Sequence, residues 1–246
     1  CLPKIVIPVH FAGRPCEMKK VWELSQKFGF RVIEDASHSF GGSYKKEPVG
    51  SCGYSDITVF SFHPVKVMTT GEGGMALTND PVLAERMRRL RTHGITRDPQ
   101  QIQDKSQGTF YYEQIELGFN YRMNDIAAVL GTSQLNRVDE FMEKRRTIAM
   151  QYNSMLVDLP LILPWQHPDA QSAWHLYVVR IDQSKTSVTR TALFDGLRSA
   201  GIGANVHYIP VHTQPYFEMM GFQRGDFPES ERYYDTCISL PIYPDL

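Results

Sequence analysis

Short apolar segments alternate with helical patterns along this sequence, and this alternation is the feature that most constrains the fold. Runs of four to six residues with the composition of buried strands are separated by stretches with apolar residues at helical spacing. A chain of this kind buries its strands in a parallel sheet and covers the sheet with the intervening helices. The expected strands are 4–9, 31–34, 56–61 and 75–78, and the expected helices are 16–28 and 81–93. The sequence therefore predicts an α/β fold with a mostly parallel sheet.

A longer helical pattern follows this first part of the chain. Residues 97–116 are polar and without a clear period, which predicts a surface loop. From 124 to 156 apolar residues recur at steps of three, four or seven, which predicts a single helix about 50 Å long. Pro160 stops that helix. A helix of this length commonly connects two domains.

The remaining sequence predicts a smaller α+β unit. Its expected elements are a strand at 175–181, a helix at 189–200 and a second strand at 204–208. We therefore expect a large domain over residues 1–140, followed by the linking helix and a small C-terminal domain over residues 141–246.

Composition narrows the classes of function. With 42% hydrophobic residues, 22% charged residues and a formal net charge of −1, the chain has no basic surplus for nucleic acid or an anionic membrane. No apolar run is long enough for a membrane span. Isolated cysteines without a C-x-x-C pair argue against a zinc site or a disulfide framework, so we expect no metal and a reducing cytoplasm. These cysteines are Cys1, Cys16, Cys52 and Cys237.

Lys66 carries the strongest chemical signal. It lies just past the end of the 56–61 strand and before the glycine-rich turn 69–74. Sheets of this class place their ligand sites at the carboxyl ends of the strands. An isolated lysine at such a place is more often a surface residue beside a tight turn.

Asp35 changes that interpretation, because it ends another apolar strand. A carboxylate there is costly unless a cation meets it. Pyridoxal phosphate chemistry needs this combination: a lysine for the Schiff base and a carboxylate that keeps the pyridine nitrogen protonated. Alone, Asp35 would be a helix or turn cap. Together with Lys66, it indicates a pyridoxal-phosphate site.

Four sequence blocks make the resemblance specific. They resemble, in the same order, the signature blocks of the DegT/DnrJ/EryC1 family of sugar aminotransferases, which are fold-type I pyridoxal-phosphate enzymes with a large and a small domain. The residues in these blocks are most similar to those of the branch that makes UDP-4-amino-4,6-dideoxy-N-acetyl-β-L-altrosamine for pseudaminic acid. The blocks are 34–38, 61–66 with 69–74, 118–122 and 205–212.

The resemblance implies roles for individual residues at the cofactor. Lys66 would be the lysine that holds the cofactor and moves the proton, and Asp35 would meet the pyridine nitrogen. His38 would lie near the phenolic oxygen of the ring, and Ser61 would bind the phosphate. Asn120 matches a residue that reaches the cofactor phosphate of the neighbouring subunit, which implies a homodimer.

Three further residues are candidates for substrate binding. Arg122 suits a sugar-nucleotide phosphate or a donor carboxylate, because its planar guanidinium matches both groups. A salt bridge on the first turn of the long helix is an equally good explanation for it. His207 and Tyr208 resemble a pair that faces the substrate, although a purely structural role in the small domain is also credible.

The function implied is amination of a nucleotide-linked 4-keto-6-deoxy hexose, with glutamate as the amino donor, to give an amino sugar for bacterial surface glycans. One alternative is an aminotransferase for a dTDP-linked 3-keto sugar, which shares the same blocks. Related sugar dehydratases have histidine in place of the lysine, so Lys66 argues against them. Another alternative is a non-catalytic cofactor-binding module or sensor.

One part of the family pattern has no match in this sequence. The N-terminal segment, which in the family supplies a phosphate loop and an aromatic residue that stacks on the pyridine ring, is not found before the strand at 4–9. We therefore expect a partial large domain, weak or absent cofactor binding by this chain alone, and an exposed apolar strand edge at 4–9.

Overall fold

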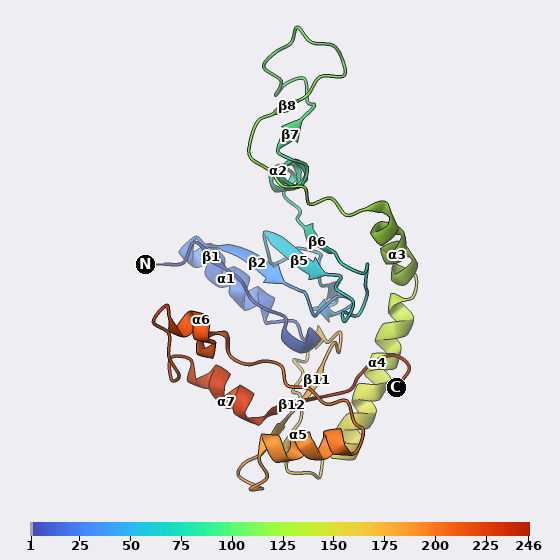
Figure 1. The fold of residues 1–246 in the computed structure, drawn as a ribbon, viewed down its shortest axis with the longest axis vertical. Helices are drawn as coiled ribbons and strands as arrows, with labels where there is room; N and C mark the ends of the chain where they lie inside the picture. Colours follow the sequence, from blue (N-terminus) through green and yellow to red (C-terminus); the bar gives the residue numbers. More distant parts are fainter. Residues whose placement is uncertain (1) are drawn as a thin grey trace.

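A four-stranded sheet forms the first half of the molecule. The computed structural model describes residues 2–246. The strands lie in the order β1, β2, β5, β6; the first three are parallel and β6 runs antiparallel to β5 (Figure 1). The expected mostly parallel sheet is confirmed. The strands are β1 (Ile5–Val6), β2 (Arg31–Asp35), β5 (Ile57–Ser61) and β6 (Gly74–Leu77).

Side chains alternate across this sheet as the strand period requires. Val32, Thr58 and Phe60 are buried, and their neighbours along the strands are only partly covered. At the edge, β1 carries large apolar side chains that remain exposed, among them Ile5 and, just beyond the strand, Ile7. The apolar edge expected at 4–9 is therefore present in the structure.

Helix α1 (Met18–Phe28) packs on the sheet, as the sequence predicts. Met18 lies in a core cluster with Val32 and Tyr44. The helix ends at Gly29, whose φ of 75° is the left-handed conformation that glycine adopts without strain.

Helix α2 (Pro81–Arg91) and the segment after it project away from the sheet (Figure 1). Asp80 begins α2 by accepting hydrogen bonds from the backbone N–H groups of Val82 and Leu83. The expected surface loop at 97–116 carries a short ladder at its base, where β7 (Ile95–Thr96) pairs with β8 (Glu113–Gln114).

The single helix expected at 124–156 is wrong. The chain forms two helices, α3 (Asp125–Leu135) and α4 (Val138–Leu156), separated at Asn136 and Arg137. Arg137 has ψ near 0°, outside the helical range, so the hydrogen-bond ladder is interrupted there.

Helix α4 connects two hydrophobic cores. Val138 and Met142 pack in the core beneath the first sheet, together with Phe60. Ile148 and Ala149, two turns further along, pack in the core of the C-terminal half. Buried residues at this spacing, apolar except for Arg145, hold the two halves together along one face of the helix. The division at 140/141 remains a prediction.

The C-terminal half is built on a second, antiparallel sheet in the order β12, β11, β9. The expected strand at 204–208 is wrong: within it, Asn205 makes an isolated bridge to Ser239 of β12. No helix of the described residues has the length and apolar character that crossing a membrane requires. The elements are β9 (Leu161–Ile162), β11 (Tyr177–Ile181), β12 (Cys237–Leu240), α5 (Arg190–Ser199), α6 (Pro215–Glu218) and α7 (Pro228–Thr236).

Three short strands form a small sheet that joins the two halves of the molecule. Strand β3 (Ser43–Tyr44) of the first half pairs with β10 (Ala170–Gln171) of the second, and with β4 (Glu47–Pro48) on its other side. Two 3-10 turns, η1 (Phe11–Gly13) and η2 (Val211–Thr213), complete the fold. The backbone N–H groups of Ala173 and Leu176 donate to carbonyls of η1. These bonds fix η1 against the C-terminal half.

Candidate active site

Asp35 and Ser61 end neighbouring parallel strands, so they lie at the same edge of the sheet. The backbone of Asp35 is fixed on both sides: its N–H donates to the carbonyl of Pro8, and its carbonyl accepts from His10. Its side-chain Oδ1 accepts from the backbone N–H of Ser37 at 3.0 Å. One carboxylate oxygen is therefore held in place, and no described residue donates to the other.

Lys66 lies close enough to Asp35 for each charge to act on the other. Burial lowers the pKa of Lys66, and the Asp35 carboxylate opposes that shift by favouring the charged amine. No hydrogen bond or ion pair joins the two side chains in the part of the chain that the structure describes. They share one region without touching, as expected for two groups that act on opposite parts of one ligand.

The turn after Lys66 is fixed by its own hydrogen bonds. Thr69 Oγ1 donates to the Phe62 carbonyl and accepts from the N–H of Gly71, whose φ is 80°. Gly74 faces β5 so closely that an added Cβ would lie 2.8 Å from the Phe60 carbonyl oxygen. The glycines of this block therefore allow the chain to turn and to pack closely against β5 beside Ser61.

His38 is a neutral imidazole with an assignable tautomer. Burial, followed by the nearby Lys66, lowers the pKa of His38 to about 4, although Asp35 acts in the opposite direction. Nδ1 of His38 accepts from the backbone N–H of Ala12 at 3.3 Å. Because a neutral ring carries one proton, the hydrogen is on Nε2, which is then a donor.

The C-terminal half brings His207 and Tyr208 to the same place. His207 Nδ1 lies 2.7 Å from the Ser239 hydroxyl, and burial together with Lys66 lowers the pKa of His207. The rings of Tyr208 and His38 are 6.3 Å apart. Lys66, Asp35 and His38 thus meet two predicted substrate residues from a segment more than 130 positions away in the sequence. We call these five residues the Lys66 cluster.

Sequence reasoning missed two residues of this neighbourhood. His175 is buried, and its ring centroid lies 4.4 Å from that of His38. Phe11, in η1, lies 5.9 Å from His38 and 6.0 Å from Tyr208. A histidine just before a mostly apolar strand, in which Arg180 is the one charged residue, was the available signal for His175. Phe11 gives no such signal, since it follows the first strand as an ordinary apolar residue.

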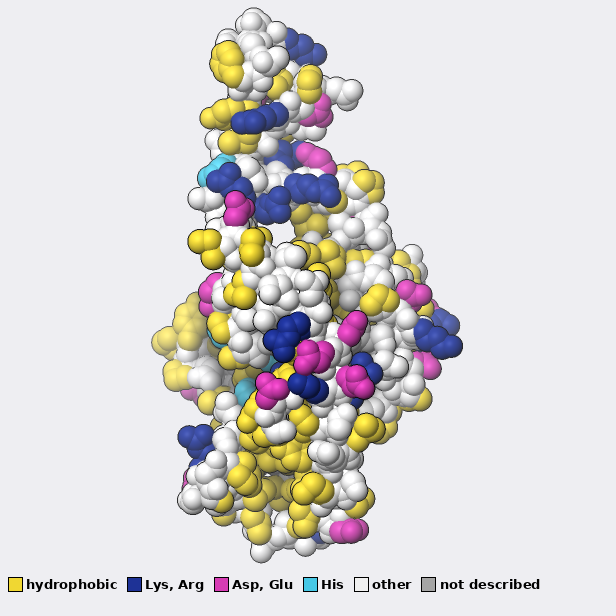
Figure 2. Space-filling model, turned by 90° about the vertical axis from the view of Figure 1, so that its right-hand side faces the viewer, with side chains coloured by type: hydrophobic (Ala, Val, Ile, Leu, Met, Phe, Trp, Pro, Cys, Tyr) yellow, Lys and Arg dark blue, Asp and Glu magenta, His cyan; other side chains and the backbone are white. Residues whose placement is uncertain are grey.

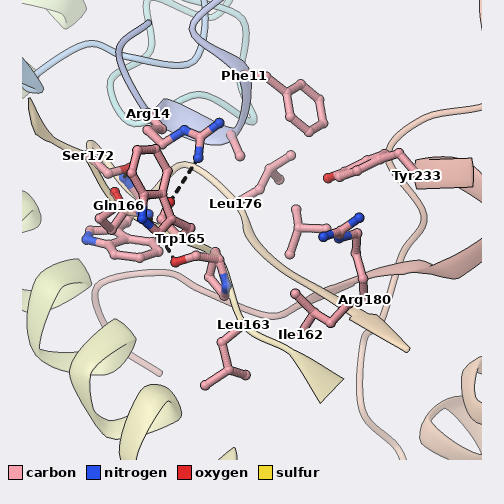
Figure 3. Close-up of a pocket in the computed structure, with 14 residues that line it drawn as sticks. Phe11, Arg14, Ile162, Leu163, Trp165, Gln166, Ser172, Leu176, Arg180 and Tyr233 are labelled. Carbon is pink, nitrogen blue, oxygen red and sulfur yellow. Dashed lines mark hydrogen bonds between the residues drawn. The ribbon is translucent and has the colours of Figure 1, made fainter. Parts of the chain in front are cut away.

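A cavity of about 270 Å³ is lined in part by Phe11. Figure 3 shows the Arg180 guanidinium and the Tyr233 hydroxyl turned toward it, with Arg14 donating to the Trp165 carbonyl at its rim. Phe11 and Tyr233 make an edge contact at 5.7 Å, which forms a wall of the cavity. Phe11 therefore lines this cavity and also lies beside His38 and Tyr208 of the Lys66 cluster.

Asn120 and Arg122 lie apart from the Lys66 cluster, on the exposed stretch before α3. Arg122 Nη2 donates to Asn120 Oδ1 at 3.3 Å, and both residues are exposed. Asn124 is the residue that caps α3, by accepting from the N–H of Ala127. No carboxylate pairs with Arg122 among the described residues. Within residues 2–246, Asn120 therefore does not cap α3, and Arg122 forms no salt bridge.

The stretch around these two residues is apolar and uncovered. We call it the 117–130 segment. Leu117 is 89% exposed and Ile126 is 85% exposed, and Phe119 stacks on Tyr121 at 4.8 Å in the open. Figure 2 shows the face that carries α3 and α4, where hydrophobic side chains are interspersed with charged ones.

Two curated proteins match almost the whole chain. The uncharacterized protein MJ1066 of Methanocaldococcus jannaschii is 41% identical over 99% of this chain and 63% of its own length. The spore coat polysaccharide biosynthesis protein SpsC of Bacillus subtilis is 40% identical over 99% of this chain and 62% of its own length. The chain thus spans somewhat less than two thirds of the length of these relatives.

Solved structures match the fold to a similar extent. PseC of Helicobacter pylori, an aminotransferase involved in the biosynthesis of pseudoaminic acid, has a TM-score of 0.85 at 32% identity, over 98% of this chain and 62% of its own. The PLP-form of the putative sugar aminotransferase Spr1654 of Streptococcus pneumoniae has a TM-score of 0.85 at 27% identity, over 99% of this chain and 64% of its own. Both similarities cover the two halves of the structure described above.

The sequence profile of one family covers nearly the entire chain. It matches residues 3–246, a range that includes every predicted site residue from Asp35 to Tyr208. The cluster around Lys66 and the fold that positions it agree with this match. The chain belongs to the DegT/DnrJ/EryC1/StrS aminotransferase family.

Proposed function

We propose that this protein is a pyridoxal-phosphate-dependent aminotransferase for a nucleotide-linked keto sugar, with Lys66 as its catalytic residue. The observation that carries the proposal is the convergence of Lys66, Asp35 and His38 at the carboxyl end of the parallel strands. This is the edge at which sheets of this class bind ligands.

The residues of the cluster fit the cofactor. Asp35 has one oxygen fixed by Ser37 and a second without a donor from the described residues, so it can accept a hydrogen bond from a protonated pyridine nitrogen. The Lys66 amine, which has no partner among the described residues, is free to bond to the aldehyde carbon. When bound, pyridoxal phosphate supplies an electron sink for a carbanion at the carbon that bears the amino group.

His38 and Ser61 complete the set of residues that would hold the cofactor. With its hydrogen on Nε2, His38 can donate to the phenolic oxygen of the ring. Ser61 lies at the end of β5, where its hydroxyl can donate to a phosphate oxygen. Neutral His38 adds no second positive charge beside Lys66, and this limits the repulsion that a charged lysine would meet there.

Lys66 is suited to move a proton. Burial lowers its pKa, which increases the fraction of neutral amine near neutral pH. A neutral Lys66 amine would take the proton from the Cα of an amino donor, and the resulting ammonium would give it to C4′ of the cofactor. With the keto sugar, Lys66 would move a proton from C4′ to the sugar carbon that receives the amino group. Asp35 limits this effect, because its negative charge favours the ammonium form.

The finer substrate proposal is a nucleotide-linked 4-keto-6-deoxy hexose, with glutamate as donor and an amino sugar for bacterial surface glycans as product. Two similarities support it: PseC is named for pseudoaminic acid biosynthesis and SpsC for a spore coat polysaccharide. His207, Tyr208 and Arg122 remain the proposed substrate residues. A dTDP-linked 3-keto sugar is the alternative within the same chemistry. The intact Asp35 and Lys66 argue against a non-catalytic module.

We further propose a homodimer in the cytoplasm. Asn120 lies on the uncovered 117–130 segment, next to apolar side chains such as Ile126. A partner seated there would cover these side chains and bring Asn120 to the partner's cofactor phosphate. The division into a large domain over 1–140 and a small one over 141–246 is part of the same proposal.

Absorbance and amination assays test the function together. Pyridoxal phosphate in large excess, which offsets the weak binding expected of this chain alone, should produce a visible band from the lysine-bound cofactor, and glutamate should bleach it. Candidate 4-keto and 3-keto nucleotide sugars are then compared as acceptors by mass spectrometry. A stable band that glutamate never bleaches, with no acceptor aminated, would favour the non-catalytic alternative.

A further inference from the structure

A cavity of about 860 Å³ lies beside the Lys66 cluster and is not explained by the cofactor residues. Its lining includes Val65, directly before Lys66, and the two predicted substrate residues His207 and Tyr208. The volume is in the range of sites for small-molecule ligands. Two buried polar side chains, Arg145 and His175, form part of its wall.

Arg145 is a buried cation without a counter-charge. It extends from α4 and is 6% exposed. Its Nη1 donates to the backbone carbonyls of Trp174 at 3.0 Å and Ile242 at 2.9 Å. Its Nε is buried without a partner, and no described carboxylate forms an ion pair with the guanidinium. Burial lowers the pKa of Arg145 to about 10, so the group is still positively charged at neutral pH.

A charge in this position is costly unless something neutralises it. Burial removes the water that would hydrate the guanidinium. Hydrogen bonds to two backbone carbonyls offset only part of that desolvation cost. Arg145 is the only lysine or arginine in the described lining of the cavity. The wall therefore presents one positive charge, which matches an anionic group of single charge.

His175 adds a neutral polar group to the same wall. It is 6% exposed, and its Nδ1 is buried without a hydrogen-bond partner. Burial, together with the nearby His38 and Lys66, lowers the pKa of His175 to about 2, so the ring is neutral and carries one N–H. His175 directly follows Trp174, whose carbonyl holds Arg145.

We propose that this cavity binds a carboxylate group of the amino-acid donor, and of the keto acid formed from it, with Arg145 as the counter-charge and His175 as a hydrogen-bonding partner. The proposal rests on the proposed function and assigns the donor side of the reaction to a site within this chain. A nucleotide diphosphate carries at least two charges and fits the single cation less well. A guanidinium matches the planar geometry of a carboxylate.

Binding to the cofactor-free protein tests this site without any turnover. Isothermal titration with glutarate and 2-oxoglutarate is compared between the wild type and Arg145→Gln. The variant should bind both dicarboxylates about 10- to 100-fold more weakly, because a charge-assisted hydrogen bond is lost. Arg146→Gln is the matched control: it removes the adjacent, exposed arginine of the same helix and should bind as the wild type does.

A second variant keeps the test decisive if Arg145→Gln does not fold. His175→Phe preserves the ring and removes both nitrogens, and it should weaken dicarboxylate binding about three- to tenfold. Unchanged binding in His175→Phe and in any folded Arg145 variant would overturn the proposal. So would binding of UDP, but not of glutarate, in a manner that depends on Arg145.

The cofactor-loaded protein separates this inference from the proposed function. Arg145→Lys should raise the KM for glutamate while leaving the KM for the nucleotide sugar unchanged. If the protein forms no lysine-bound cofactor band, the proposed function fails, and the titration of the cofactor-free protein still decides the carboxylate site. If the band forms and the KM for glutamate does not change, the carboxylate site fails and the proposed function stands.

Discussion

The Lys66 cluster and the 117–130 segment both carry residues of the family's signature blocks. They differ in whether those residues meet other predicted site residues within one chain. In the Lys66 cluster, side chains from both halves meet: Lys66 acts on the pKa of His38 and of His207, and His38 packs on His175. In the 117–130 segment, Asn120 and Arg122 hydrogen-bond to each other in the open.

The difference teaches which functions a single copy of this chain can supply. The sheet edge and the C-terminal half alone bring the side chains of the Lys66 cluster together, whereas the proposed cofactor site also takes Asn120 of the partner subunit. The 117–130 segment exposes large apolar side chains, such as Leu117, that a folded protein ordinarily covers. We therefore interpret the first region as a site formed within the chain, and the second as a contact surface that serves another subunit's site.

Replacing Lys66 gives the largest expected effect, and it tests whether the Lys66 cluster is a cofactor site. Lys66→Ala removes the amine that bonds to the cofactor and moves the proton. The visible cofactor band should disappear, and turnover should fall at least about 10²- to 10⁴-fold. Circular dichroism should be unchanged. Lys105→Ala, on the exposed hairpin, is the control; a Lys66→Ala protein with band and turnover intact would remove the central assignment.

Asp35→Asn tests whether the cluster works as a unit. The carboxylate raises the pKa of Lys66 against the effect of burial, so the neutral amide should let that pKa fall further. Cofactor retention should weaken about 10- to 100-fold, because a charge-assisted hydrogen bond is lost. The pH dependence of Lys66 acylation in the cofactor-free protein measures the first effect, and equilibrium dialysis of the loaded protein measures the second. A Lys66 pKa that stays the same or rises in the cofactor-free variant would show that Asp35 does not act on Lys66.

Much of this site follows from the sequence, for identifiable reasons. The strands before Asp35 and Lys66 are apolar runs, and their parallel pairing places both residues at one edge of the sheet. His175 was missed because the residues that follow it, apart from Arg180, are mostly apolar and favour a core interpretation. Arg145 was missed because its position depends on carbonyls of Trp174 and Ile242, which no local pattern connects to α4.

The errors in the fold have a similar origin. The apolar period continues from α3 into α4, so the sequence contains no strong signal for the break at Arg137. The break separates an exposed helix from one packed on two cores, which is a property of tertiary packing. The strand expected around Asn205 fails for a related reason, because pairing with β12 extends over a single bridge.

The pH dependence of the free energy of unfolding tests whether His175, beside the Lys66 cluster, is neutral in the native state. His175 is neutral in the native state, because burial lowers its pKa to about 2, whereas an unfolded histidine has a pKa of 6.5. Between these values the unfolded chain binds a proton that the native chain does not, so stability falls as the pH drops below about 6.5.

His175→Phe should remove this contribution. The free energy of unfolding, measured by urea denaturation from pH 7 to pH 5, should then depend on pH less steeply, by up to roughly 1.4 kcal/mol per pH unit. Phe222→Leu, at an exposed position, changes no titratable group; it is the control and should retain the wild-type slope. An equal slope in His175→Phe and the wild type would mean that His175 is charged or solvated in the native state.

The smallest effects concern the second region, where two asparagines four positions apart give a matched pair. Asn124 caps α3, and Asn124→Ala should cost about 1 kcal/mol, which lowers the Tm by roughly 2–4 °C. Among the described residues, the side chain of Asn120 hydrogen-bonds only to the exposed Arg122, so Asn120→Ala should change stability by less than about 0.5 kcal/mol. Cofactor retention should show the reverse order. If Asn120 reaches the partner's cofactor phosphate, its loss should weaken retention about five- to tenfold, while Asn124→Ala leaves it unchanged.

Differential scanning fluorimetry of the cofactor-free proteins and dialysis of the loaded ones measure the two quantities separately. Equal retention in both variants would place the 117–130 segment outside any cofactor site, and the exposed apolar side chains would then need a different partner.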